Sequence, residues 1–336
     1  MTLSINTNVG ALVALRNLND VTQQLNKTQN RVSTGLRVAS AKEDASVFAV
    51  AQGVRSDIKA YEAVSGALAG AKGLLSTAIS GATAVSNLMA DVKVKLTQLA
   101  DDAISAEQRE IYQLDLKGQI DQIRQFLEQS DYNEKNILSG NTSDALIANW
   151  TDAQAASVIG DITGGTIAIR ENDLMTGGSG AGDIGGWAGL ARLAYTTAAD
   201  TTASNTAILT AERTGATVLT AAQARAALAD VAANGSRSTT ALGGADSVFN
   251  SAWDFFNREV NQALGTLGTD NRFIDSRATF NVELRDAVEE GLGSLVDADI
   301  ARESARLQAL QTRQQLSVQT LSIANQAPTV LLSLFQ

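Results

Sequence analysis

The chain has 336 residues and a formal net charge of −10, so its charge has the wrong sign for a nucleic-acid partner. It contains no cysteine and no histidine, which excludes disulfides, thiolate metal sites and the commonest general base of enzymes. Proline occurs once, at Pro328. Because proline breaks helices, its near absence permits very long ones, and we expect a mainly α-helical fold.

The first predicted element is a helix from Asn8 to about Ser33, because its apolar positions fall three and four residues apart. Its seam has the heptad spacing of a coiled coil and consists of Leu18, Val21, Leu25, Thr28 and Val32, with Leu12 and Leu15 beside it. Gly35 then interrupts the helix. Ser40 and Glu43 have the Ser-x-x-Glu spacing of a capping box, which predicts the start of a second helix.

The second helix is predicted to run roughly from Ala41 to Ala103. Several glycines inside it argue against an unbroken helix: Gly66, Gly70, Gly73 and Gly81. A second capping signature, Ser105 with Gln108, predicts a third helix that ends near Ser130. Its buried face is predicted to hold Leu116, Ile120, Ile123 and Leu127.

Beyond the third helix the composition changes to Thr, Ala, Gly and Ser. One run, Gly164–Arg170, reads as a strand, and the residues from Leu219 to Gly235 read as a helix. Otherwise little periodicity is sustained between Thr176 and Gly244, so we predict a small, variable insertion at the surface. Helical patterning resumes near residue 248 and continues to the end, with a second heptad seam of Val296, Ile300, Leu307, Leu310, Ser317, Leu321 and Ala324.

Both chain ends are almost free of charge: the first charged side chain is Arg16, and none occurs from Gln314 to Gln336. Neither end has the pattern of a signal peptide, and the C-terminal end is too polar for a membrane span, so we expect no membrane insertion. The order of the elements predicts a hairpin in which the terminal helices run side by side. Two helices alone leave most of each apolar stripe in water.

We therefore expect the ends to form an assembly interface that becomes ordered when neighbouring copies cover it, since a buried unpaired charge there would be costly. The alternative is a monomeric helical bundle whose terminal helices belong to its own core. The positions predicted to lie in the interface are Leu12, Leu15, Leu18, Leu25, Val32, Leu307, Leu310, Leu321, Val330, Leu331, Leu334 and Phe335.

Three segments resemble bacterial flagellins. "SINTNVGALVALRNLNDVTQQLNKTQNRVSTGLRVASAKEDA" is similar to the family's N-terminal signature, "QSDYNEKNILSG" to the exit from its third helix, and "ADIARESARLQALQTRQQLSVQTLSIANQAPTVLLSLFQ" to its C-terminus. The resemblance implies a non-enzymatic, cofactor-free subunit of the flagellar filament. It implies an antiparallel inner coiled coil (1–40 and 294–336), a helical middle domain with a β-hairpin (41–176 and 248–293) and a small variable outer domain (177–247). The implied interdomain turn includes Leu36, Ser40, Lys42, Glu43 and Asp44.

The resemblance also implies partners. These are other copies of the chain in a homopolymer, a flagellar cap protein, hook-associated junction proteins, and an export chaperone with the type III export apparatus. The protein would be extracellular, secreted without a cleaved signal peptide. Two other functions stay open at this point: a hook–filament junction protein, and a glycan-binding or catalytic role for the outer domain.

One departure from the family concerns recognition by the vertebrate toll-like flagellin receptor. Flagellins that it senses resemble an Arg-x-x-Glu-Leu-Ala pattern on the second helix, whereas this chain has Lys95, Thr97 and Gln98 before Leu99. Lysine lacks the bidentate geometry of arginine, and glutamine removes the charge of glutamate. We hypothesise weak or absent recognition.

Several short motifs each allow both a functional and a purely structural interpretation. Gly180–Gly185 fits a dinucleotide-binding glycine pattern but lacks a strand–helix frame, so a loop is the simpler reading. The pairs Asp101–Asp102 and Glu289–Glu290 could hold a cation or form solvated faces. Asn141 and Asn149 match the N-glycosylation pattern, and the Ser/Thr-rich stretch from Thr196 to Thr240 could carry O-linked glycans.

Overall fold

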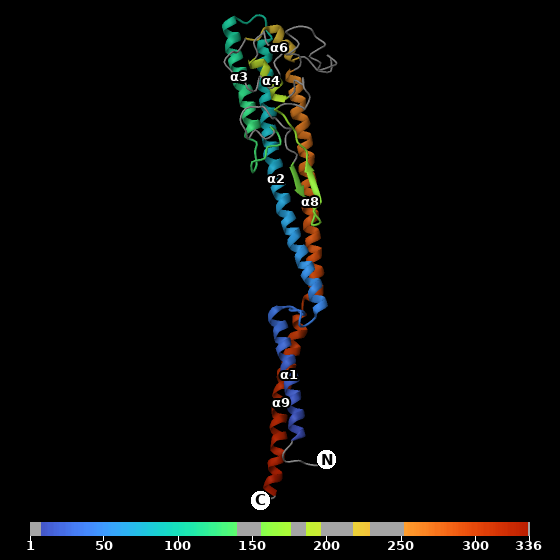
Figure 1. Ribbon diagram of the computed structural model, residues 1–336. Coiled ribbons are helices and arrows are strands. Elements are labelled where there is room, and N and C mark those ends of the chain that lie inside the picture. The colour runs from blue at the N-terminus through green and yellow to red at the C-terminus, as the bar shows by residue number, and fades with distance from the viewer. Residues whose placement is uncertain (1–7, 140–155, 176–185, 196–217, 229–251, 335–336) are drawn as a thin grey trace. The chain divides into compact units, whose positions relative to one another are not determined.

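A computed structural model describes residues 8–139, 156–175, 186–195, 218–228 and 252–334 (Figure 1). The chain divides into two compact units. The first contains residues 1–62 and 283–336, and the second contains residues 63–282. The predicted fold class is confirmed, because the described elements are mainly helices, with one small antiparallel sheet.

In the first unit, helices α1 (Val9–Thr34) and α9 (Ile300–Leu334) run antiparallel to each other (Figure 1). Asn8 begins α1 as its N-cap, since its side-chain oxygen accepts a hydrogen bond from the Ala11 amide at 3.1 Å. The same side chain donates to the carbonyl of Ala324 at 2.7 Å, so the start of α1 lies against the later part of α9. Gly35 ends α1 with the left-handed backbone that glycine favours, at φ 73°.

The turn after α1 is joined to the segment between α8 (Ala252–Val296) and α9. Leu36 and Asp297 form an isolated β-bridge, and the Arg37 amide donates to the Val296 carbonyl at 2.6 Å. The Arg37 guanidinium donates to the Leu295 carbonyl at 2.5 Å. These contacts hold the end of α1 next to the segment that leads into α9.

The predicted capping box at Ser40 is wrong. Helix α2 (Ala45–Leu99) begins four residues later than expected, and Asp44 caps it by accepting from the Ser46 and Val47 amides at 3.1 Å. Glu43 instead accepts from the Ala39 amide at 2.9 Å, inside a turn that precedes the helix. An aspartate adjacent to the first helical residue satisfies its free amides more directly than a serine five residues away.

The second unit is built on α2, α3 (Ala106–Glu128) and α8. The apolar seam of α2 is fully buried at Leu68, Leu75, Ala78, Val85, Met89, Val92, Leu96 and Leu99. The predicted face of α3 is confirmed, since Leu116, Ile120, Ile123 and Leu127 are all buried, and so is the Ser105–Gln108 capping box. Helices α2 and α3 are joined by Lys95 and Asp115, whose charged groups lie 2.7 Å apart.

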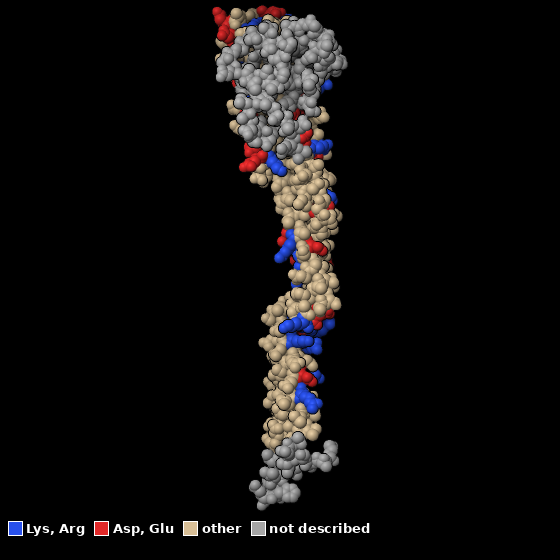
Figure 2. All heavy atoms as spheres, viewed as in Figure 1, with Lys and Arg blue, Asp and Glu red and all other residues tan. Residues whose placement is uncertain are grey.

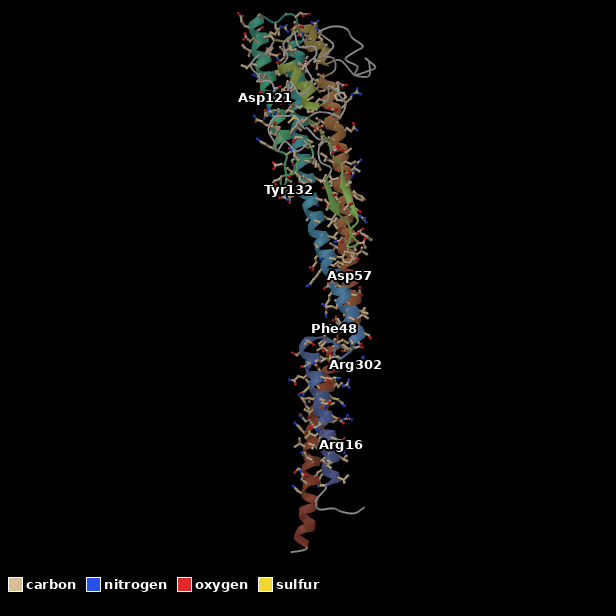
Figure 3. All side chains as sticks on the ribbon, viewed as in Figure 1. Arg16, Phe48, Asp57, Asp121, Tyr132 and Arg302 are labelled. Atoms are coloured by element: carbon tan, nitrogen blue, oxygen red, sulfur yellow. The ribbon has the colours of Figure 1, made fainter. Side chains whose placement is uncertain are left out.

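Helix α2 is unbroken despite its glycines, and two of them admit the segment after α3. The Tyr132 ring lies so close to Gly73 that a Cβ there would come within 2.7 Å of it (Tyr132 is labelled in Figure 3). A Cβ on Gly81 would overlap the Ser130 hydroxyl. Gly73 and Gly81 therefore allow the segment after α3 to lie close against α2. A Cβ on Gly66 or Gly70 would meet nothing within 4 Å.

The predicted strand is confirmed as β2 (Thr166–Ile169), which pairs antiparallel with β1 (Ala156–Ile159). The hairpin is attached to α8 by polar contacts. The Arg170 guanidinium contacts the Asp270 carboxylate at 2.6 Å, and the Thr266 hydroxyl donates to the Asn172 side chain at 2.5 Å. Ile167 and Ile169 of β2 are buried.

Two short helices come from the predicted outer domain, α4 (Gly186–Tyr195) and α6 (Ala221–Leu228). Both pack into the core of the second unit. The Trp187 indole donates to the Ile120 carbonyl of α3 at 2.8 Å, and the Arg225 guanidinium donates to the Ala100 carbonyl at the end of α2 at 3.0 Å. The three-domain division and its boundaries remain a prediction.

Candidate assembly surface

The facing sides of α1 and α9 form one seam. Side chains are buried or half-buried at alternating three- and four-residue spacing on both helices, as the heptad pattern predicts. The α1 positions are Ala14, Leu18, Val21, Leu25, Thr28 and Val32; the α9 positions are Glu303, Leu307, Leu310, Gln314, Ser317, Leu321 and Ala324. Six residues predicted to contact other copies thus pack inside one chain: Leu18, Leu25, Val32, Leu307, Leu310 and Leu321.

A polar layer crosses this seam near the turn. Thr28 is buried, and Arg31 and Glu303 form an ion pair at 3.5 Å with side chains only 25% and 12% exposed. Arg31 Nε and Glu303 Oε2 have no hydrogen-bond partner among the described residues. Because some of its polar atoms lack partners, this largely buried ion pair adds little net stability to the α1–α9 pair. It disfavours any other alignment of α1 against α9, since a shift would separate Arg31 from Glu303 and leave each charge without its partner.

Large apolar side chains remain exposed on the same two helices. On α1 they are Val9, Leu12, Val13 and Leu15. On α9 they are Ile300, at the end next to the turn, and Leu316, Val318 and Ile323. We name the seven residues other than Ile300 the tip surface. Because Asn8 meets Ala324 whereas Arg31 meets Glu303, all seven lie in the half of the pair that is remote from the turn.

Charges are sparse on this pair. Figure 2 shows mostly uncharged atoms over the described part of α1 and α9, interrupted by small basic and acidic groups. Figure 3 places Arg302 close to the turn and Arg16 farther along α1. Arg16 and Asp20 are the charged residues of α1 in this half of the pair, and their charges are opposite, so its exterior is mostly apolar and almost neutral.

Two of the predicted interface positions, Leu12 and Leu15, belong to the tip surface, and its other five residues were not among the predicted positions. The predicted positions were chosen mainly from the heptad seam. The sequence feature that could have identified the other tip residues is the number of apolar residues outside that seam. Val330, Leu331 and Leu334 belong to the last turns of α9, but their side chains and Phe335 lie outside the described residues. Outside them as well lie Gly180–Gly185, Asn141, Asn149 and the stretch Thr196–Thr240, except for residues 218–228.

The predicted receptor region lies on α2 in the second unit. The Lys95 ammonium contacts Asp115 and lies 5.5 Å from the centre of the Tyr112 ring. The Thr97 hydroxyl donates to the Lys93 carbonyl at 2.8 Å, and Gln98 Oε1 is buried. Leu99 is fully buried. Lys95, Thr97 and Leu99 are therefore engaged by the chain itself, whereas Gln98 Oε1 has no hydrogen-bond partner among the described residues.

The described residues do not support a metal site or a membrane span. They contain no cluster of three or more acidic residues placed to hold a metal ion, and none of their helices combines the length and apolar character needed to cross a bilayer. Asp102 forms an ion pair with Arg225, and Glu289 and Glu290 are exposed on α8. The described carboxylate pairs are thus solvated or paired with arginine.

The chain is similar to known proteins along its whole length. Residues 5–143 match the family described as the bacterial flagellin N-terminal helical region, and residues 251–335 match its C-terminal helical region. A flagellin of Brucella melitensis biotype 1 is 33% identical over 99% of both chains. Flagellin C of Rhizobium meliloti (strain 1021) is 30% identical over 99% of both, and flagellin FljO of Caulobacter vibrioides is 29% identical over 99% of this chain and 98% of the relative.

Proposed function

The chain belongs to the bacterial flagellin family and is a structural subunit of the extracellular flagellar filament; from this premise we propose how its terminal helices divide the work of assembly. The seam between α1 and α9 holds the two ends of one chain together. The tip surface packs against neighbouring copies. The observation that carries this proposal is the exposure of seven large apolar side chains on a pair whose seam is already closed.

The free energy gained by burying apolar side chains favours this division. Burying one exposed Val, Leu or Ile side chain contributes about 1.5–3 kcal/mol, so seven per chain form a strong drive to associate. Patches of this kind on soluble proteins mark interaction sites. A seam with Thr28, Gln314 and Ser317 gives the lone pair only moderate stability, so we still expect the ends to become fully ordered when other copies cover them.

A matched pair of variants tests the proposal. Leu12→Asp places a charge on the tip surface, whereas Gln23→Asp adds the same charge to an exposed α1 position nearer the turn. In elongation from wild-type filament seeds, Leu12→Asp should raise the critical concentration more than tenfold, and Gln23→Asp less than twofold. Equal effects of the two variants would show that the tip surface has no special role.

The remaining partners are proposals that rest on family membership: a cap protein at the growing tip, hook-associated junction proteins, and an export chaperone feeding a type III export channel. A chain without cysteine and with one proline suits export in the unfolded state. We also propose export without a cleaved signal. Protein taken from filaments should then keep residues 2–15 in its intact mass, and loss of this segment would contradict the proposal.

We further propose weak recognition by the vertebrate toll-like flagellin receptor. Lys95 would have to leave Asp115 and Tyr112 before it could bind another protein, and Gln98 is half-buried. Purified monomer applied to receptor-expressing cells should give little activation. Strong activation would overturn this part of the proposal.

A further inference from the structure

The α1–α9 pair is held at its turn end by contacts that lie outside the seam. Leu36 and Asp297 form a β-bridge, and the Ala298 amide donates to the Gly35 carbonyl at 2.8 Å. These bonds join the segment after α1 to the segment before α9. The turn end of the pair is therefore closed by backbone contacts that do not depend on the packing of the two helices.

Arg37 completes this closure by capping α8. Its amide donates to the Val296 carbonyl at 2.6 Å, and its guanidinium donates to the Leu295 carbonyl at 2.5 Å. The last carbonyls of a helix have no partner within it and carry partial negative charge, so a cation that donates hydrogen bonds suits them well. One residue thus ties the chain after α1 to the end of the helix that leads into α9.

The half of the pair that is remote from the turn has a more polar seam. Beyond Leu310, which is 4% exposed, the next two seam positions of α9 are Gln314 and Ser317. At this end the Asn8 side chain donates to the Ala324 carbonyl. Polar side chains in a seam stabilise a helix pair less than apolar ones do, and the large apolar residues of this half are exposed as the tip surface. We therefore expect this half to close less readily by itself.

We propose that the α1–α9 pair closes from the turn to the tip, and that Arg37 is the positioning residue that starts this closure. The proposal rests on the assembly role of these helices and adds the order in which they pair. Both helices lie in one compact unit with the first part of α2 and the last part of α8. The bridge joins the segments that leave those two helices, so it closes a short loop, whereas a first contact at Asn8 would close a longer one. Each later turn of the pair then forms next to a turn that is already in place.

The absence of cysteine from the chain allows closure to be trapped as a disulfide at chosen positions. A turn probe carries Thr28→Cys and Leu307→Cys, at seam positions in the half next to the turn. A tip probe carries Ala11→Cys and Ala324→Cys, because Asn8 forms hydrogen bonds with both of these residues. The rate of disulfide formation in the lone full-length chain reports how often each end closes.

Variants in each half distinguish an ordered closure from an all-or-none one. Arg37→Ala should slow trapping at least fivefold at both probes, and Arg37→Lys, which keeps one cationic donor, should recover part of the rate. Lys27→Ala removes an exposed cation from the same half of the pair and should change neither rate more than twofold. Ala14→Asp, in the seam of the tip half, should slow the tip probe alone. If Ala14→Asp slows both probes, or if Arg37→Ala leaves either probe unchanged, the order of closure is wrong.

Seeded elongation separates this proposal from the filament function. At equal subunit concentration, Arg37→Ala should elongate wild-type seeds at least fivefold more slowly than Lys27→Ala does. Circular dichroism checks that both variants keep the helices of the second unit. Equal elongation rates overturn the order of closure and leave the filament function intact, whereas failure of wild type to elongate its own seeds overturns the filament function itself.

Discussion

Replacing Gly81 with alanine should destabilise the second unit, although the same change at Gly70 of the same helix should stabilise it. In an open helix, Gly→Ala stabilises by about 0.5–1 kcal/mol because alanine loses less backbone entropy on folding. At Gly81 the new Cβ would overlap the Ser130 hydroxyl and come within 3.3 Å of the Leu138 side chain. Ser130 is itself buried and donates to the Phe126 carbonyl at 2.5 Å, so it cannot move without losing that bond.

The size of the effect follows from these contacts. Overpacking a closed site costs about 1–3 kcal/mol, and losing one hydrogen bond costs about 1 kcal/mol, so Gly81→Ala should cost about 1–3 kcal/mol after the helix gain is subtracted. Gly70→Ala meets nothing within 4 Å and should gain about 0.5–1 kcal/mol. The two single variants should therefore differ in the sign of the stability change.

Urea unfolding followed by far-ultraviolet circular dichroism measures both variants in the same chain. The urea midpoint should fall for Gly81→Ala and rise for Gly70→Ala. Ser130→Gly in the Gly81→Ala background should recover much of the loss, because it removes the atoms that clash. Equal midpoints for the two alanine variants would refute the argument that Gly81 exists to admit the chain after α3.

Three further outcomes are expected. Leu310→Asp puts a charge into the closed α1–α9 seam and should abolish polymerisation while the circular dichroism of the second unit persists. Hydrogen bonds from the Thr163 hydroxyl and the Gly165 amide lower the pKa of the exposed Asp161 carboxyl. The support that this carboxylate gives the hairpin turn is therefore present at neutral pH and lost below about pH 4. Asp161→Asn should reduce the acid dependence of the hairpin's amide protection, as measured by NMR. Lys95→Ala should free Asp115 and barely change polymerisation, which a seeded assay checks.

The sequence alone predicted the features that depend on local periodicity. The seam of α1, the α9 seam from Leu307 to Ala324, the buried face of α3, the Ser105 cap and strand β2 are confirmed, since each is determined within one or two helical turns or one strand. Ile300, which was also predicted for the second seam, is 44% exposed. The sequence alone failed where distant residues decide the outcome. The glycines of α2 argued against an unbroken helix. Nothing near Gly73 and Gly81 in the sequence shows that Tyr132 and Ser130 occupy the space that a side chain would fill at these two positions.

Local periodicity also could not identify five residues of the tip surface: Val9, Val13, Leu316, Val318 and Ile323. A heptad pattern identifies the side of a helix that meets its first partner, but it does not tell whether that partner is another helix of the same chain or another copy. Once the structure pairs α1 with α9, the seam residues are accounted for, and the apolar residues left outside it become the informative ones.

The two helices of the pair differ in how their apolar side chains are distributed. Beyond Leu15, those of α1 lie on the seam side, whereas those of α9 are spread around the helix, with Leu310 in the seam and Leu316, Val318 and Ile323 outside it. A helix that is apolar on several sides is stable in water only when it is surrounded. In the filament, α9 is therefore the helix that we expect other copies to enclose, while the polar face of α1 stays in contact with water.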